Sequence, residues 1–359
     1  MTASLSLATA DLNAAATQET APQMTLPTPQ ALKRQCPLGT TLSDRVDAQR
    51  QQIRDILEGR DDRLLAVVGP CSIHDPRSAL EYARRLASLA DSIRDRVLVV
   101  MRVYVEKPRT TVGWKGLAYD PDLDGKGDMA RGLELSRQLM REIVELGLPV
   151  ATEILQPMIA PYLEDLLAWV AIGARTTESQ LHREMASGIG AVVGFKNATS
   201  GDVQVALDAM RSAAHPHQHF AVGEQGQPVM RETTGNPYTH VVLRGGHGEP
   251  NYGVDAVAAA RKALIGTGLP PRLMVDCSHA NARKDHRRQS EVLLEVLAQR
   301  LAGDTSLIGV MLESHLNEGK QPLEPGKLRY GVSVTDACIG WETTEHLLSL
   351  AAERLAQQG

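Results

Sequence analysis

A cysteine, a histidine and two carboxylates lie at the ends of apolar segments of this sequence. Cys71 follows the Gly-Pro turn of VVGPCSIHDP, His279 ends RLMVDCSH, Glu313 lies in LIGVMLESH, and Asp336 follows in GVSVTDACIGWE. Thiolate, imidazole and carboxylate form a mixed soft and hard ligand set, which suits Mn, Fe, Co or Zn better than Mg or Ca. Each of these residues alone is more often structural, so a metal site requires a fold that brings them together.

Basic side chains lie at or just beyond the ends of other apolar segments. They are Arg102, Lys107, Arg109, Arg175, Lys196 and Arg244, and a further segment ends in Glu153. In a chain with a net charge of -5, so many cations around one opening require anions from elsewhere. Guanidinium groups bind carboxylates and phosphates in bidentate fashion, so the cluster predicts a ligand with several anionic groups. The alternative is a network of structural ion pairs.

Alternating elements could place all these residues at one end of a barrel. Eight short apolar segments alternate with amphipathic helical ones, and the strands are expected in RLLAVVGP, RVLVVMRVY, LPVATEIL, AWVAIGAR, GAVVGFKN, THVVLRGG, RLMVDCSH and LIGVMLESH. Such apolar strands indicate a parallel sheet buried on both faces, and their number favours a closed (β/α)8 TIM barrel over an open sheet. In such barrels the active site lies at the carboxyl ends of the strands, where the candidate residues fall.

Other segments extend this barrel. Residues 1–28 are rich in Ala, Thr and Ser and predict a flexible N-terminal arm, whereas residues 29–359 predict a single catalytic domain. Within that domain, residues 29–62 or so predict a helical extension, and residues from about 217 to 240 predict an inserted β-hairpin around EQGQP and TTGNP.

Composition narrows the class of protein further. The acidic net charge gives no reason to expect nucleic acid or a membrane surface as a partner. Four scattered cysteines predict neither a disulfide framework nor a structural zinc module. No apolar run reaches the roughly 18 residues of a membrane helix, and no targeting pattern is apparent. We therefore expect a cytoplasmic protein.

Nine segments in this order resemble the type I 3-deoxy-D-arabino-heptulosonate 7-phosphate (DAHP) synthases. They are GPCSIHDP, MRVYVEKPRTTVGWKG, ATEIL, AIGARTTESQLHREMASG, VGFKNATSGD, VVLRGG, DCSHANARKD, GVMLESHLNEG and GVSVTDACIGWE. The resemblance implies a metal-dependent condensation of phosphoenolpyruvate with erythrose 4-phosphate, with release of phosphate, as the first step of the shikimate pathway. These substrates carry two phosphates and a carboxylate, in agreement with the cluster of cations.

The resemblance also implies roles for single residues. It assigns the metal to Cys71, His279, Glu313 and Asp336, the phosphoenolpyruvate contacts to Arg102, Lys107, Glu153, Ala174, Arg175, Lys196 and Arg244, and the aldose phosphate contacts to Arg109 and Thr110, beside Pro108. The metal is expected to polarise the aldehyde oxygen, and Lys107 to donate a proton to the new hydroxyl. Glu153 and Lys196 are expected to position the water that adds to C2.

Regulation by an aromatic amino acid is a further implication of the resemblance. Family members are commonly inhibited by one such amino acid, bound near the hairpin and the N-terminal extension of a neighbouring subunit, so a homodimer or homotetramer is expected. At Pro157 and Gly190 this sequence resembles the tyrosine-sensitive members of the family. Met185 and Ile189 complete the expected effector site.

Three alternatives are less well supported. A 3-deoxy-octulosonate 8-phosphate synthase would share the cations, but the KPRTTVGWKG segment argues against it. A non-catalytic amino acid sensor or chorismate mutase partner would have no need of four intact metal ligands. A class II aldolase site would be richer in histidine.

Overall fold

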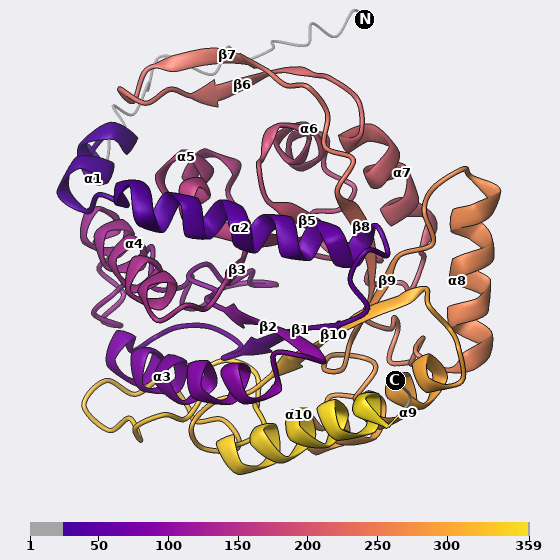
Figure 1. Cartoon of the computed structure of the whole chain (residues 1–359). Helices are drawn as coiled ribbons and strands as arrows, with labels where there is room; N and C mark the ends of the chain where they lie inside the picture. The colour runs from indigo at the N-terminus through magenta and orange to yellow at the C-terminus, as the bar shows by residue number, and fades with distance from the viewer. Residues whose placement is uncertain (1–23, 358–359) are drawn as a thin grey trace, which may run out of the picture.

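A computed structural model describes residues 24–357 of the chain. Of the predicted N-terminal arm, residues 1–23 lie outside the described residues. Figure 1 shows the barrel with its surrounding helices and a separate hairpin beyond them.

Eight parallel strands form a closed barrel, as the alternating segments predicted. The strands are β1 (Leu64–Gly69), β2 (Val97–Arg102), β3 (Val150–Glu153), β4 (Leu167–Ile172), β5 (Val192–Lys196), β8 (Thr239–Leu243), β9 (Leu273–Asp276) and β10 (Leu307–Glu313). Their order around the barrel is β1-β10-β9-β8-β5-β4-β3-β2, so each strand pairs with its neighbour in sequence and β1 closes on β10.

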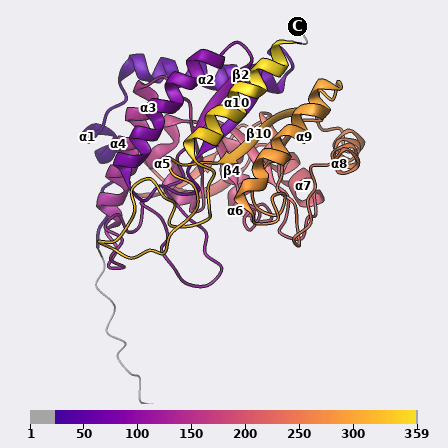
Figure 2. The ribbon, with the colours of Figure 1, turned by 90° about the horizontal axis from the view of Figure 1, so that it is seen from below.

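Helices surround the barrel on its outside, as the view from below also shows (Figure 2). They are α3 (Pro76–Ile93), α4 (Met129–Glu145), α5 (Ala160–Leu163), α6 (Gln180–Gly188), α7 (Gln204–Ala213), α8 (Val254–Gly266), α9 (Gln289–Leu301) and α10 (Trp341–Ala356), with short 3-10 turns η1 (Pro157–Ile159), η2 (Glu164–Leu166) and η3 (His286–Arg288). The sequence specifies several starts: Asp75 accepts a hydrogen bond from the N–H of Arg77 and precedes Pro76 in the first turn of α3. No described helix is long and apolar enough to cross a membrane.

Side-chain alternation along the strands divides the core into two layers. Leu64, Ala66 and Val68 pack against the helices, whereas Leu65 and Val67 belong to the cluster inside the barrel. The inside is filled so tightly that a side chain at Gly194 would clash with Trp169. The barrel is therefore a packed core that supports a site at its end, as is usual for this fold.

Two helices precede the barrel, α1 (Pro29–Gln35) and α2 (Gly39–Leu57). Helix α2 lies across the N-terminal end of the barrel (Figure 1), where Arg50 donates a hydrogen bond of 2.8 Å to the carbonyl of Leu167 at the start of β4. Ile53 and Leu57 of α2 belong to the cluster inside the barrel. One end of the barrel is thus closed by α2, and the opposite end carries the loops after the strands.

The hairpin is formed by β6 (Gln218–Val222) and β7 (Pro228–Glu232), which pair antiparallel outside the barrel. Its turn contacts α1, because Lys33 Nζ lies 2.7 Å from Glu224 Oε1. Phe220 and Met230 are opposite each other in the hairpin register, and both are mostly exposed.

Candidate active site at the carboxyl ends of the strands

A cavity of about 320 Å³ lies among the loops after the strands. The predicted site residues that line it are Lys107, Pro108, Arg109, Thr110, Glu153, Ala174, Arg175, Lys196, Arg244, His279 and Asp336. They come from the ends of seven different strands or from the loops that follow them, which are far apart in sequence. Most of the predicted substrate contacts therefore face one space.

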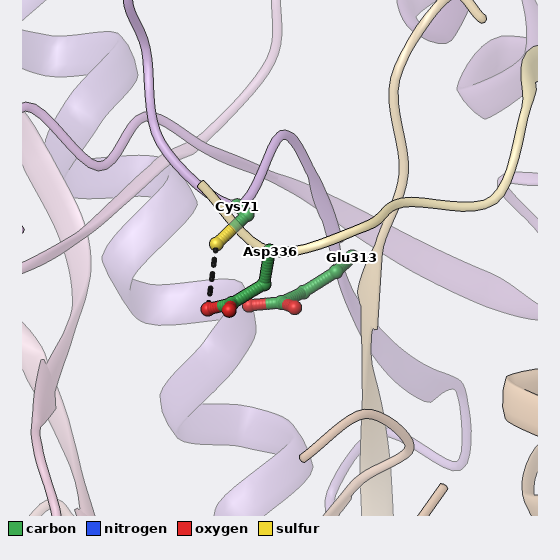
Figure 3. A group of neighbouring side chains, drawn as sticks. All are labelled: Cys71, Glu313 and Asp336. Carbon is green, nitrogen blue, oxygen red and sulfur yellow. Dashed lines mark hydrogen bonds between the residues drawn. The ribbon is translucent and has the colours of Figure 1, made fainter. Parts of the chain in front are cut away.

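Cys71, Glu313 and Asp336 form a cluster that could hold a metal ion (Figure 3). Their ligand atoms all lie within 4.8 Å of one another, and the Cys71 thiol donates to Oδ2 of Asp336 at 3.4 Å. Glu313 is the last residue of β10, whereas Cys71 and Asp336 lie on loops. The two loops are joined by a 2.7 Å hydrogen bond between the hydroxyls of Ser72 and Thr335.

A cation already contacts this cluster. Nζ of Lys107 lies 2.8 Å from Sγ of Cys71 and 3.1 Å from Oδ2 of Asp336. Burial and the charge of Glu313 raise the pKa of Cys71 to about 12, whereas Lys107 lowers the pKa of Asp336 below its ordinary value. The thiol and two carboxylates fit a divalent transition metal, whose charge would favour the thiolate.

His279, the fourth predicted ligand, lines the same cavity as Asp336 but is not part of the three-residue cluster. Its Nδ1 lies 2.9 Å from Oδ2 of Asp276 and 2.7 Å from the hydroxyl of Ser278. Its backbone is in the left-handed region, with φ of 55°, which is uncommon outside glycine. The turn after β9 therefore holds this ring through its Nδ1 side.

Sequence reasoning missed Asp276, the last residue of β9. This carboxylate is fully buried and lies 2.8 Å from Nζ of Lys196. Burial opposes its ionisation, but its contacts with the His279 ring and the Lys196 ammonium hold its pKa well below the ordinary value. The signal in the sequence was the Asp of DCSH, which directly precedes a candidate ligand.

Arg102, also a predicted substrate contact, is 1% exposed and is not among the residues that line this cavity. Its Nη2 donates to Oε1 of Glu313 at 3.1 Å, and its guanidinium lies 4.0 Å from the centre of the Tyr104 ring. Its Nη1 is buried and has no hydrogen-bond partner among the described residues. Since a buried donor without a partner is costly, this atom indicates a place for an anionic ligand group.

Small residues position the other groups around the cavity. A side chain at Gly173 would clash with Oε1 of Glu153, so the carboxylate keeps its present position beside a residue that has no side chain. Gly113 has φ of 147° and packs in the same way against the guanidinium of Arg109. Across the cavity, Arg175 donates a 3.3 Å hydrogen bond to the hydroxyl of Thr110.

The four expected effector residues do not share one cavity. Gly190 lines a separate cavity of about 450 Å³, together with Arg50, Glu164 and Arg231. Met185 and Ile189 are 5% exposed and pack in the core outside the barrel. Pro157 begins η1, which contacts α6 and β6.

Comparisons with known proteins give a consistent result. The model of the DAHP synthetase I family matches residues 40–349. The chain is 53% identical over 328 residues to the Tyr-sensitive phospho-2-dehydro-3-deoxyheptonate aldolase of Escherichia coli (strain K12), covering 91% of this chain and 92% of that one. It is 50% identical to the Trp-sensitive enzyme of Enterobacter agglomerans, covering 92% and 95%. A solved phospho-2-dehydro-3-deoxyheptonate aldolase from Francisella tularensis SCHU S4 has a TM-score of 0.92 at 43% identity, covering 94% of this chain and 99% of that chain.

Proposed function

The chain belongs to the DAHP synthetase I family, and from this membership we propose how its side chains divide the work of the reaction. The protein condenses phosphoenolpyruvate with erythrose 4-phosphate in the first step of the shikimate pathway. The observation that carries the assignment of roles is one cavity lined by several cations, with a thiol and two carboxylates gathered at its side.

The anionic groups of the substrates are bound by separate sets of cations. Arg175, Arg244 and Lys196 bind the phosphate of phosphoenolpyruvate, and the unpartnered Nη1 of Arg102 binds its carboxylate. Arg109 and Thr110 lie on the loop after β2 and bind the phosphate of the aldose. Bidentate contacts of this kind fix both substrates in one orientation, which is a large part of the catalytic effect.

The metal is held by Cys71, Glu313 and Asp336, with His279 as the fourth ligand. When bound, a divalent ion such as Mn, Fe, Co or Zn supplies Lewis acidity toward the aldehyde oxygen. Lys107 already contacts two of these ligands, so its ammonium is in place to hold the proton that the new hydroxyl group needs.

Glu153 acts on phosphoenolpyruvate. Its carboxylate lines the cavity and has no hydrogen-bond partner among the residues of the described range. We assign it to accept a proton from the water that adds to C2 of phosphoenolpyruvate, with Lys196 positioning that water. Phosphate then leaves by cleavage of its bond to C2.

Tyrosine is the proposed feedback inhibitor. The cavity beside Gly190 contains both cations, Arg50 and Arg231, and carboxylates, among them Glu164, which suits the ammonium and carboxylate of a free amino acid. The Tyr-sensitive relative of Escherichia coli is 53% identical, against 50% for the Phe- and Trp-sensitive ones and 48% for the tyrosine-inhibited relative of Schizosaccharomyces pombe.

A homo-oligomer in the cytoplasm is the proposed state of the protein. The exposed Phe220 and Met230 of the hairpin form an apolar surface suited to a second copy. All four cysteines are free, as is usual in a reducing compartment.

Consumption of phosphoenolpyruvate tests this function in chelator-treated protein, with and without added Mn²⁺. We expect turnover with erythrose 4-phosphate only when the metal is restored, and inhibition by tyrosine. Faster turnover with arabinose 5-phosphate would favour the octulosonate synthase alternative. Folded protein that is inactive with every metal would favour the sensor alternative.

A further inference from the structure

Asp276 joins two parts of the site that have different tasks. Oδ2 of Asp276 lies 2.8 Å from Nζ of Lys196 and 2.9 Å from Nδ1 of His279. Oδ1 accepts hydrogen bonds from the backbone N–H of Ser278 at 3.0 Å and from its hydroxyl at 2.6 Å. The side chain is fully buried at the end of β9, so water cannot replace any of these contacts.

We propose that Asp276 is a positioning residue that aligns His279 for the metal and Lys196 for phosphoenolpyruvate at the same time. The inference rests on the function proposed above, because it takes its two tasks from there. It adds a residue that contacts neither ligand itself and acts through both side chains.

The hydrogen bonds around His279 determine which ring nitrogen carries the proton. The Ser278 hydroxyl donates to Asp276, so its lone pairs face Nδ1 of His279 at 2.7 Å. Both neighbours of Nδ1 are then acceptors, and Nδ1 must be the protonated nitrogen. Nε2 consequently keeps its lone pair, which is the form that binds a metal, and a carboxylate behind a histidine ligand also fixes the ring and raises its basicity.

Lys196 depends on the same oxygen atom. It is 4% exposed, and Asp276 is its only side-chain hydrogen-bond partner among the described residues. The carboxylate balances the ammonium charge when the cavity is empty and fixes where the ammonium points. Because one oxygen serves both side chains, loss of its charge must disturb metal binding and phosphoenolpyruvate binding together.

The variant Asp276→Asn is the direct test, since it keeps the size of the side chain. An amide can face Ser278 or the pair of Lys196 and His279 with its oxygen, but its NH₂ group then meets donors on the other side. Each orientation places at least one donor against a donor.

Asp304 provides a matched control. Its Oδ1 accepts from the N–H and hydroxyl of Ser306 at 3.0 and 2.5 Å, and its Oδ2 lies 2.8 Å from Nη1 of Arg261. This arrangement repeats that of Asp276, but it precedes β10 (Leu307–Glu313) and is therefore at the opposite end of the barrel. Asp304→Asn breaks the same kind of turn and ion pair without approaching the cavity.

Calorimetry on metal-free protein measures the dissociation constants of Mn²⁺ and, with Mn²⁺ restored, of phosphoenolpyruvate. For Asp276→Asn we expect Mn²⁺ to bind about 10- to 100-fold more weakly, as for other partners of metal-bound histidines, and phosphoenolpyruvate to bind more weakly as well. Asp304→Asn should leave both constants within about twofold of the wild type, the usual result for a site far from the ligand. Thermal denaturation of both variants separates these effects from loss of folding.

Unchanged dissociation constants in folded Asp276→Asn would overturn this inference but leave the proposed function intact. If Asp276→Asn does not fold, the variant Ser278→Ala replaces it as the test. This variant removes one acceptor at His279 and must weaken Mn²⁺ binding more than phosphoenolpyruvate binding. An unchanged dissociation constant for Mn²⁺ would count against the inference. Wild-type protein that binds neither ligand would refute the proposed function, and the inference with it.

Discussion

The positions of several side chains in this site depend on glycines beside them as well as on the groups that they contact. Glu153 keeps its present position because Gly173 has no side chain, and Arg109 lies against Gly113 for the same reason. Lys107 approaches Cys71 closely because the thiol and Asp336 are both acceptors for its ammonium. The chemistry of the site therefore requires small residues at fixed places beside the reactive ones.

The variant Gly173→Ala tests this dependence. The added methyl group would clash with Oε1 of Glu153 and displace the carboxylate from the cavity. Misplacement of a reacting group by about 1 Å can cost on the order of 100-fold in rate, so we expect kcat to fall by about 10- to 100-fold.

Gly266→Ala serves as the control for this variant, because it lies in α8 and its added atom meets nothing within 4 Å. It should leave kcat unchanged. Equal kcat for Gly173→Ala and the wild type would show that the position of Glu153 does not limit the reaction.

Glu106 predicts a pH dependence of stability. Burial raises its pKa from 4.5 to about 7, although it accepts hydrogen bonds from the N–H groups of Leu155 and Gln156 and from the Tyr119 hydroxyl. The folded protein then binds more protons than the unfolded chain between about pH 4.5 and 7, so stability falls as the pH rises through this window.

Glu106→Gln removes the titrating group and keeps its shape. The variant should gain about 2 kcal/mol of stability relative to the wild type between pH 5 and pH 8. Denaturant titrations at both pH values measure this difference. A difference between variant and wild type that does not change with pH would mean that Glu106 titrates normally.

At the scale of elements, the sequence predicts the barrel well and the cavities less well. The alternation of apolar and amphipathic segments predicted all eight barrel strands. Because parallel strands end at one face, the same pattern also predicted that their last residues would lie close together. Asp276 was not predicted as a site residue because no periodicity shows which residue of DCSH turns inward. His279 adopts a left-handed backbone that no sequence rule indicates.

The cavity beside Gly190 could not be predicted from the sequence either. It combines residues of α2, η2 and β7, which no local pattern connects. Met185 and Ile189 are apolar side chains whose spacing also suits packing, and both lie in the core outside the barrel. Their place at the effector stays a prediction. Sequence patterns identify faces of elements, but not which distant elements meet.

Gly190→Ser tests the role of this cavity. A side chain at residue 190 would begin 3.4 Å from Nη1 of Arg50, and its hydroxyl would enter the space proposed for tyrosine. We expect the concentration of tyrosine that halves activity to rise by about tenfold, equivalent to about 1.4 kcal/mol. Activity without tyrosine should not change. Unaltered inhibition would place the effector elsewhere.

At the scale of the whole molecule, an acidic chain concentrates cations in one cavity and leaves an apolar surface on its hairpin. The cavity beside Gly190 includes Arg231 of that hairpin, so a second copy covering the hairpin would also lie next to the proposed effector. Assembly and regulation are therefore expected to depend on the same segment.

The double variant Phe220→Asp and Met230→Asp tests this expectation. Charges on both exposed apolar positions should prevent a second copy from packing there, because burying unpaired carboxylates is costly. Sedimentation velocity should show a smaller species than the wild type, with tyrosine inhibition weakened. A species of unchanged size would exclude the hairpin as the contact surface.

We propose that a metal ion binds at the side of the cationic cavity through Cys71. Cobalt(II) bound to the protein tests it most directly, because a thiolate ligand gives a charge-transfer absorption in the near ultraviolet. We expect this band in the wild type and in Cys338→Ser, which changes a neighbouring buried thiol outside the ligand cluster, and we expect its loss in Cys71→Ser. A band that persists in Cys71→Ser, or that is absent from active cobalt-loaded wild type, would show that Cys71 is not a metal ligand.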